Sequence, residues 1–440
     1  MGLLNIFSNK RKVKDELHDH PDIFFGQYAG LNKTKHQAEH LEKAKSLYKA
    51  QQYIDAFEHF FLYLKNPLTE NLAFNRDHSK ISFRLIQGSK IISGFVNEQE
   101  VLAEAEIVRF SDTDNLLMQK LLRQNYHLKY CKFAIKNNIY SIKFFGITGD
   151  IQPESLYRAL LEMAVYADSY DDILMLEFNN LQNMNIKHIH HIAGEKVDLR
   201  LKYLKKFLGA IINTPLNEQS TNATFNTRLK MLNNLYSIDY LIAPGGKLQS
   251  KIRKLIDEAE KSDEQKRAKI NETIKNTVAL IYETDNNELA NDLQKVIRTF
   301  PEKEPAKLSK IKNYIQKHLN EANFFLSEGF EETSNLLLEY IVCSLSYKYG
   351  LMVSQENILL ILWQYFHPSF FEDTKLSSGF FDRESGRFNE NIIKEYITDT
   401  IRNARKKEHA IAYRADEIKF DTGTNFLFSF LEQFAAIKYR

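Results

Sequence analysis

The chain has 440 residues, enough for two to four hydrophobic cores at the usual domain size of roughly 100–200 residues. Its 59 Lys and Arg nearly balance its 57 Asp and Glu, so the net charge of +2 gives no long-range field that would favour nucleic acid or an anionic membrane. Gly (16) and Pro (8) fall below their usual shares of about 7% and 5%, which predicts a helix-rich protein.

Cysteine usage and apolar runs predict a cytoplasmic protein. Cys131 and Cys343 lie far apart and form no CxxC pair, as in reduced proteins. The opening MGLLNIFSNKRKVK places its charges after a short apolar run, the reverse of a signal peptide. The longest apolar runs, such as Ile358–Trp363, fall far short of the ~20 residues of a membrane span, so none is expected.

The first 67 residues divide into two regions. Residues 1–37 are polar and rich in His and Lys, which predicts a flexible lead-in. Residues 38–67 carry two short helical patterns with spacings that resemble one tetratricopeptide hairpin, closed by Asn66-Pro67. A single hairpin of this kind cannot bury its apolar face alone. The alternative interpretation is that it is the first helical element of the next domain.

Residues 78–180 alternate between apolar and polar positions, as strands with one buried face do. Turns are expected at Gly88-Ser89 and at Asn137-Asn138, and Pro153 is expected to open a final helix. The predicted order of elements is β-β-β-α-β-β-α. Four positions are predicted to face the core of the sheet: Phe83, Leu85, Phe133 and Phe144.

The last predicted helix of this region carries PESLYRALLEMAVYADSYDDIL, Pro153 to Leu174. With the order of strands and helices before it, this string resembles the YbjN-like family, chiefly at Ala167, Asp168, Tyr170, Asp171 and Asp172. The resemblance implies an α/β sandwich like that of the type III secretion chaperones, which bind other proteins and carry out no chemistry. It also implies that an extended client segment lies along the sheet or adds to an open strand edge.

The rest of the chain predicts a largely α-helical C-terminal half in an α+β protein. Residues 185–300 form helical stripes and include a highly charged stretch that suits an exposed helical arm. The segment Pro301–Pro305 predicts a domain boundary, because proline cannot continue a helix. Residues 306–440 predict an aromatic-rich helical domain with a loop containing Gly379 and Gly386.

Catalytic and metal-binding patterns are weak throughout, so no catalytic residue, metal site or cofactor is predicted. The histidines of KHIHHI, His188, His190 and His191, have only Glu195 as a nearby carboxylate and are interpreted as structural. Pro244-Gly245-Gly246-Lys247 lacks the frame of a phosphate-binding loop and predicts a helix stop and restart. Asp168, Asp171 and Asp172 are interpreted as a solvated acidic turn or a structural cap.

An aromatic cluster in the last region raises two interpretations, core packing and a protein-binding groove with aromatic anchors. The candidate protein-binding residues are Trp363, Phe370, Phe371, Phe380, Phe381 and Phe388. Because several of them surround a loop, replacement of Phe380 and Phe381 by Ser is expected to spare folding and weaken capture of a partner.

The sequence thus predicts a non-catalytic protein-binding protein, either a chaperone-like holder or an adaptor in a cytosolic assembly. Its expected partner is a protein of unknown identity, and a homodimer through the chaperone-like domain is a further expectation. The alternative is a nucleic-acid-related or enzyme-like factor that acts through the C-terminal helical half. That alternative depends on the basic run Arg402, Arg405, Lys406 and Lys407, which a charged helix end explains as well.

Overall fold

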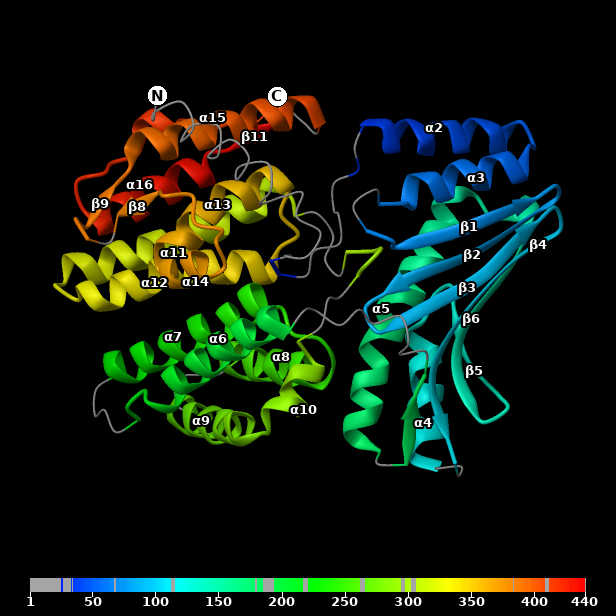
Figure 1. Ribbon diagram of the computed structural model, residues 1–440, viewed down its shortest axis with the longest axis horizontal. Coiled ribbons are helices and arrows are strands. Elements are labelled where there is room, and N and C mark those ends of the chain that lie inside the picture. Colours follow the sequence, from blue (N-terminus) through cyan, green and yellow to red (C-terminus); the bar gives the residue numbers. More distant parts are fainter. Residues whose placement is uncertain are drawn as a thin grey trace.

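The computed structural model describes residues 25–26, 33, 35–66, 69–111, 115–178, 180–184, 194–216, 221–261, 266–293, 297–301, 306–382, 384–407 and 411–439. Within these ranges the chain forms two parts that lie side by side (Figure 1). The N-terminal part contains an antiparallel sheet, and the C-terminal half is mostly helical. The predicted α+β class is confirmed at this level. Residues 187–192, which hold the KHIHHI string, lie outside the described residues.

Seven strands form the sheet, in the order β1-β2-β3-β4-β6-β5, with β7 paired to the end of β4. Their bounds are β1 (Leu72–Asp77), β2 (Lys80–Gln87), β3 (Lys90–Asn97), β4 (Glu100–Phe110), β5 (Lys132–Lys136), β6 (Ile139–Ile147) and β7 (Leu181–Asn183). The three predicted strands before the first helix correspond to β2, β3 and β4. Both β1 and β7 were absent from the predicted order.

The predicted turns lie where the sequence places them. Asn137 and Asn138 have φ of 53° and 59°, the left-handed geometry of a two-residue hairpin turn between β5 and β6. Gly88 has φ of 57° between β2 and β3. A Cβ atom at Gly88 would also lie 1.8 Å from Asp168 Oδ1, so this turn requires glycine for space as well as for conformation.

Helices cover one face of the sheet. α3 (Tyr53–Leu64) follows α2 (Lys35–Lys49) and places Phe57, Phe60, Phe61 and Leu64 in the sheet core. The Phe61 and Phe83 rings lie 4.7 Å apart, so the predicted N-terminal hairpin packs on the sheet. α5 (Pro153–Glu177), the helix predicted to open at Pro153, buries Leu156, Leu160 and Ala164 against β3, β4 and β6. The predicted core positions Phe83, Leu85, Phe133 and Phe144 are all buried.

α4 (Asn115–His127) lies on the same side of the sheet, beside the end of α5. Leu117 and Leu121 belong to the core that contains Phe133 and Tyr140 of the neighbouring strands. Lys120 of α4 forms an ion pair with Glu177 of α5. The opposite face of the sheet points away from the helical half in Figure 1.

The first helices of the C-terminal half pack into a common core. They are α6 (Gly194–Ile212), α7 (Thr221–Ser237) with its π-helical end (Ile238–Ile242), α8 (Gly246–Lys261), α9 (Arg267–Glu283) and α10 (Asn286–Asn291). Gly246 opens α8, so the predicted stop and restart is confirmed. The predicted charged arm, however, is not an exposed arm: Ile252, Ile256, Ile274 and Val278 are fully buried. Their charged neighbours occupy the solvent faces of two ordinary amphipathic helices.

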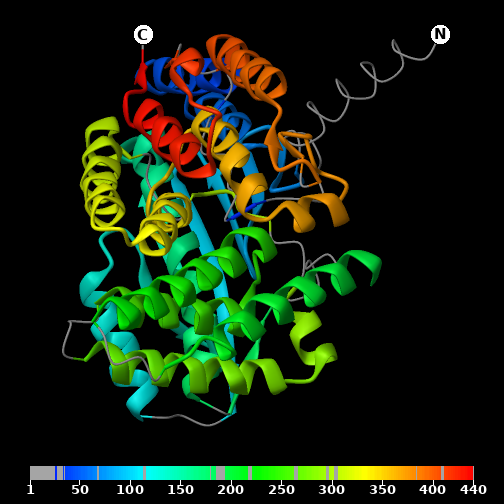
Figure 2. The same ribbon diagram turned by 90° about the vertical axis from the view of Figure 1, so that its left-hand side faces the viewer.

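The remaining helices complete this core (Figure 2). They are α11 (Leu308–Ser327), α12 (Glu331–Lys348), α13 (Val353–Phe366), α14 (Pro368–Asp373), α15 (Glu390–Lys407) and α16 (Gly423–Ala435), with the short pairs β8 (Phe381–Asp382) and β9 (Arg387–Phe388), and β10 (Ile411–Ala412) and β11 (Lys438–Tyr439). A single hydrophobic cluster extends from Tyr203 to Ile437, so residues on both sides of the predicted boundary share one core.

Residues 297–300 connect the two parts, and we call them the strap. Gly88 donates its N–H to Ile297 O, and the Thr299 and Phe300 N–H groups both donate to Gln87 Oε1 at 3.0 and 2.9 Å. Phe300 is fully buried in the core of the sheet part. The chain just before the predicted boundary at Pro301 is therefore bound to the N-terminal sheet.

Candidate protein-binding surface

The uncovered face of the sheet carries an apolar row across three strands. Phe95 of β3 lies opposite Leu102 of β4, which in turn lies opposite Phe145 of β6. Residues directly opposite each other project from the same face. Ile147 follows Phe145 by two residues on β6 and shares that face. Phe145 is 63% exposed and Ile147 is 57% exposed, so the row is open to solvent. We call these four residues the sheet row.

The surroundings of the sheet row are close to neutral. Lys143, two residues before Phe145 on β6, forms an ion pair at 3.1 Å with Glu104, which lies opposite it on β4. Lys80 Nζ lies 4.2 Å from the centre of the Phe95 ring, a cation–π contact. A face with an apolar centre and a paired polar rim matches the anatomy of protein interfaces.

The two edges of the sheet differ in the backbone groups that they offer. Ile86 N–H donates to Asn71 O, so the hydrogen-bonded pairs along β1 and β2 fall at alternate residues. Leu72, Phe74 and Arg76 therefore direct their N–H and C=O groups to the outer edge of β1. On β5 the corresponding groups of Phe133 are occupied, because the Asn125 side chain accepts from Phe133 N–H at 2.6 Å and donates to Phe133 O at 3.3 Å.

Of the six candidate anchors, four lie in the helical core and Phe388 packs against it, which corrects the interpretation as a surface groove. Trp363 and Phe371 are fully buried, and Phe370 and Phe380 are at most 3% exposed. Phe381 and Phe388 are half-buried and pack on Tyr365, with ring centres 5.4 Å from it in both cases. The loop wraps back over α13, α15 and α16, which supply the rings that cover it.

Part of this aromatic cluster contacts the chain's own N-terminal region. The Phe25 ring lies 5.5 Å from the Phe371 ring and stacks on Tyr240 at 5.8 Å. Gly26 N–H donates to Tyr240 O at 2.7 Å. Phe25 and Gly26 of the predicted lead-in are thus bound to the helical half, where the Phe25 ring packs against Phe370 and Phe371.

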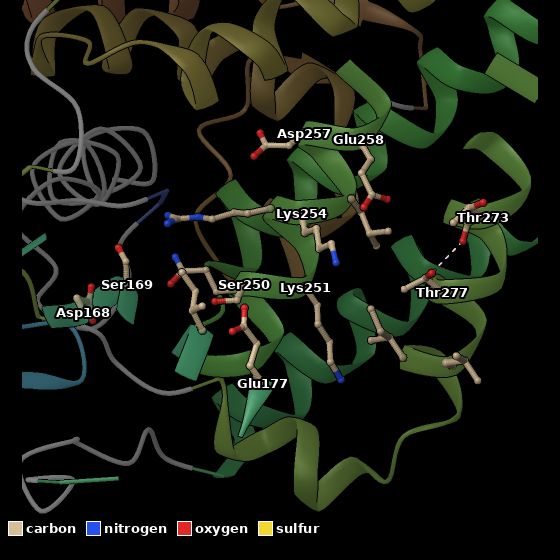
Figure 3. A pocket seen from close by; sticks show the side chains of 16 residues that line it. Asp168, Ser169, Glu177, Ser250, Lys251, Lys254, Asp257, Glu258, Thr273 and Thr277 are labelled. Atoms are coloured by element: carbon tan, nitrogen blue, oxygen red, sulfur yellow. Dashed lines mark hydrogen bonds between the residues drawn. The ribbon is translucent and has the colours of Figure 1, made fainter. Parts of the chain in front are cut away.

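A pocket of about 830 Å³ lies between α5 of the sheet part and helices α8 and α9 of the helical half (Figure 3). Its charged lining combines three cations with four carboxylates: Lys251, Arg253, Lys254, Asp168, Glu177, Asp257 and Glu258. Asp168, from the string that carries the family resemblance, accepts Ser89 N–H at 2.9 Å and lies 3.6 Å from Arg298. The charges of its lining nearly cancel.

Two partly buried polar groups combine side chains of the kinds found in catalytic sites. Ser237 Oγ lies 3.0 Å from His367 Nε2 and donates to Asn233 O at 2.7 Å. Since the only hydroxyl proton goes to that carbonyl, His367 donates Nε2–H and has no lone pair there to accept a proton from Ser237. Burial, helped by Lys206, lowers the pKa of His367 to about 3, so the ring is neutral.

Glu260 forms the second group. It accepts hydrogen bonds from the hydroxyls of Tyr236 and Tyr340 and from Lys348 Nζ, the last two at 2.7 and 2.8 Å. Burial opposes ionisation of this carboxyl, but Lys348 and the hydroxyls bring its pKa below the usual range. These bonds join α7, α8 and α12.

The cysteines and the basic run can also be placed. Cys131 and Cys343 are buried free thiols, and burial raises the pKa of both. In the described part of the chain, no cluster of three or more His, Cys, Asp or Glu has the geometry to hold a metal ion. Arg402, from the basic run of the alternative hypothesis, pairs with Asp399 at 3.0 Å.

Sequence comparisons assign no family to this architecture. The chain matches no protein-family model, and no curated protein matches it significantly. Among the described residues, no helix is long and apolar enough to cross a bilayer.

Proposed function

We propose that this protein is a non-catalytic, chaperone-like holder or adaptor that binds a partner protein on the uncovered face and the β1 edge of its sheet. The observation that carries the proposal is the sheet row, in which Phe145 and Ile147 are more than half exposed beside Phe95 and Leu102. Exposed apolar residues are ordinary when scattered, but an adjacent row on one face is a feature of interaction sites.

The β1 edge supports the same function. Backbone groups of Leu72, Phe74 and Arg76 point outward, where an extended segment could pair with them as an eighth strand. Main-chain pairing requires no particular client sequence, and the neighbouring sheet row would supply side-chain contacts. This combination suits a protein that holds an extended client.

Site-specific photocrosslinking tests the proposal. A benzoylphenylalanine at position 145 of the full chain is expected to crosslink a discrete protein in a lysate of the source cells. Phe324 on α11 is the matched control, because it is 58% exposed and lies in the helical half. Ile147→Ser should weaken the crosslink at 145 without lowering the melting temperature. Equal crosslinking at 145 and 324 would contradict the proposal.

Two single proline substitutions on β1 distinguish a client that adds as a strand at the β1 edge from one that docks on the sheet row. Arg76→Pro removes an outward N–H and leaves the β1–β2 ladder intact, at the cost of exposed ion pairs with Asp55 and Glu58 that are worth about 0–1 kcal/mol. Asn75→Pro removes a ladder bond and should destabilise the edge instead. Loss of the crosslink in Arg76→Pro with unchanged melting would support strand addition, and full retention would confine binding to the sheet row.

A further inference from the structure

A second exposed apolar surface lies on the helix-covered side of the sheet, away from the sheet row. It comprises α4, the loop after it and β5. The exposed fractions of its large apolar side chains are 69% for Leu116, 68% for Leu122, 90% for Tyr126, 38% for Tyr130 and 46% for Ile135. We call these residues, with the cations of α4, of the loop after it and of β5, the α4–β5 surface.

The charge of this segment departs sharply from the balance of the whole chain. From Asn115 to Gly149 the sequence has no Asp or Glu, and its six cations are Lys120, Arg123, Lys129, Lys132, Lys136 and Lys143. A run of this kind creates a local positive potential even in a protein of near-zero net charge.

The carboxylates of neighbouring elements that reach this segment already have partners within it. Glu177 pairs with Lys120 and Glu104 pairs with Lys143. Glu162 of α5 accepts the backbone N–H groups of residues 129, 130 and 131 at 2.7 to 2.9 Å. The exposed Arg123, Lys129 and Lys136 side chains consequently have no carboxylate partner within the described ranges.

The same hydrogen bonds preform the surface and restrict how a partner can bind it. Asn125 occupies the outward backbone groups of Phe133, and Glu162 occupies the N–H of Cys131, so a strand cannot pair at the start of β5. Lysines at a sheet edge also discourage edge-to-edge pairing. Edge protection alone explains Lys132 and Lys136, but it does not explain exposed leucines on α4.

We propose that the α4–β5 surface binds an acidic amphipathic helix of a partner protein. Leu122 and Tyr126 lie one turn apart on α4 and form an apolar stripe, and Arg123 and Lys129 flank it. A helix that covers this stripe with its apolar face can direct Asp and Glu toward the flanking cations. The 13 residues of α4 extend about 20 Å at 1.5 Å per residue, which sets the length of the partner helix.

The structure disfavours the other classes of partner. A second copy would bring Arg123, Lys129 and Lys136 of each surface together, and these cations repel. Tyr126 and Tyr130 could stack on a nucleobase, but Leu116, Leu122 and Ile135 make up most of the large exposed apolar side chains and offer no planar group. Because Leu117 and Leu121 are buried in the core, the exposed apolar face of α4 is too small for a helix that binds a bilayer surface. This surface is separate from the sheet row, so the inference goes beyond the proposed function and stands or falls independently of it.

Peptide display on the full-length protein tests the inference. A random 16-residue library is selected on the wild type in the presence of excess soluble Arg123→Glu/Lys129→Glu/Lys136→Glu protein as competitor. The enriched peptides are expected to be acidic, with apolar residues at helical spacing. The affinity of a labelled enriched peptide, measured by fluorescence anisotropy, should fall at least tenfold in the triple variant and in Leu122→Ser/Tyr126→Ser. Circular dichroism checks that both variants fold.

Lys310→Glu/Lys312→Glu/Lys317→Glu is the matched control, because it changes the net charge equally at three exposed lysines of α11. It should retain affinity, as should Phe145→Ser/Ile147→Ser, which disables only the proposed sheet site. Failure to enrich acidic peptides, or an equal loss in the control triple, overturns the inference. Tight binding of a 20-residue oligothymidylate or of phosphatidylserine vesicles, abolished by the α4–β5 triple variant, would also overturn it by assigning the surface to another anionic partner.

Discussion

At the scale of single residues, burial decides which side chains can act on a partner and which respond to pH. The sequence placed Phe83 and Phe144 on the core side of the sheet correctly, since strand alternation fixes the face of every second residue. It could not place Phe380 or Phe381, because a loop has no periodicity and the rings that cover it, such as Tyr396 on Phe380, come from helices later in the chain.

His367 gives a pH prediction with a defined sign. Its native pKa is about 3, and its unfolded pKa is about 6.5, so the unfolded chain binds a proton that the native state excludes. The stability that the neutral ring contributes is complete above pH 6.5 and is lost as the pH falls toward 3. At pH 4.5 the loss is about 3 kcal/mol, at 1.36 kcal/mol per pH unit.

His367→Phe should remove this loss. Urea unfolding at pH 7 and pH 4.5 is expected to show a difference in unfolding free energy smaller by about 3 kcal/mol in the variant than in the wild type. The exposed His127, changed to Asn, is the control and should follow the wild type. The same acid sensitivity in His367→Phe and wild type would show that the ring is not held neutral in the native state.

At the scale of elements, the sequence predicts whatever has a regular pattern. The alternation of β2 to β6 and the asparagine turn identified the central sheet. β1 was not predicted because Leu72–Asp77 has only two apolar side chains on its core side, Leu72 and Phe74. The strap was not predicted because it binds Gln87, which lies more than 200 residues earlier in the chain, and a local sequence pattern cannot indicate such a contact.

Attachment of the strap to the sheet should depend on the Gln87 side chain. Gln87→Ala leaves the N–H groups of Thr299 and Phe300 and the Phe300 carbonyl without their partner, and each buried polar group left unpaired costs about 1–3 kcal/mol. Hydrogen exchange of residues 297–301 is expected to accelerate, and the unfolding free energy should fall by at least ~2 kcal/mol. The exposed Gln99→Ala serves as control. Unchanged exchange in Gln87→Ala would show that the strap is held by Phe300 alone.

At the scale of the whole molecule, the two hydrophobic cores do not follow the predicted boundaries. The core of the sheet part begins with Ala44 in α2 and includes Phe300 from beyond the first helices of the C-terminal half. The core of the helical half spans both predicted helical regions. Sequence patterns identify elements and faces, but the assignment of an element to a core depends on contacts between distant residues. The surfaces left uncovered by both cores, the sheet row and the α4–β5 surface, were for that reason not specified by the sequence.

The division into cores predicts how fragments behave. A fragment of residues 78–180, the region whose sequence resembles an α/β sandwich, lacks β1 and the four α3 side chains that fill the sheet core, Phe57, Phe60, Phe61 and Leu64. Loss of a large buried side chain costs about 2–5 kcal/mol, so the absence of four exceeds the usual stability of a domain. This fragment is expected to show no cooperative thermal transition by circular dichroism.

A fragment of residues 35–183 retains α2, α3 and every strand of the sheet, and lacks only Phe300 from the core of this part. It should therefore fold with a mixed α/β circular dichroism spectrum and unfold cooperatively. Its stability should rise when Phe300 is supplied by a peptide of residues 295–302, because that ring packs on Tyr157 at 5.2 Å and the peptide backbone bonds Gln87. A peptide with Phe300→Ala should have a much smaller effect. Cooperative unfolding of residues 78–180 alone would show instead that the sheet does not need α3, and that the N-terminal hairpin is an addition to an independent domain.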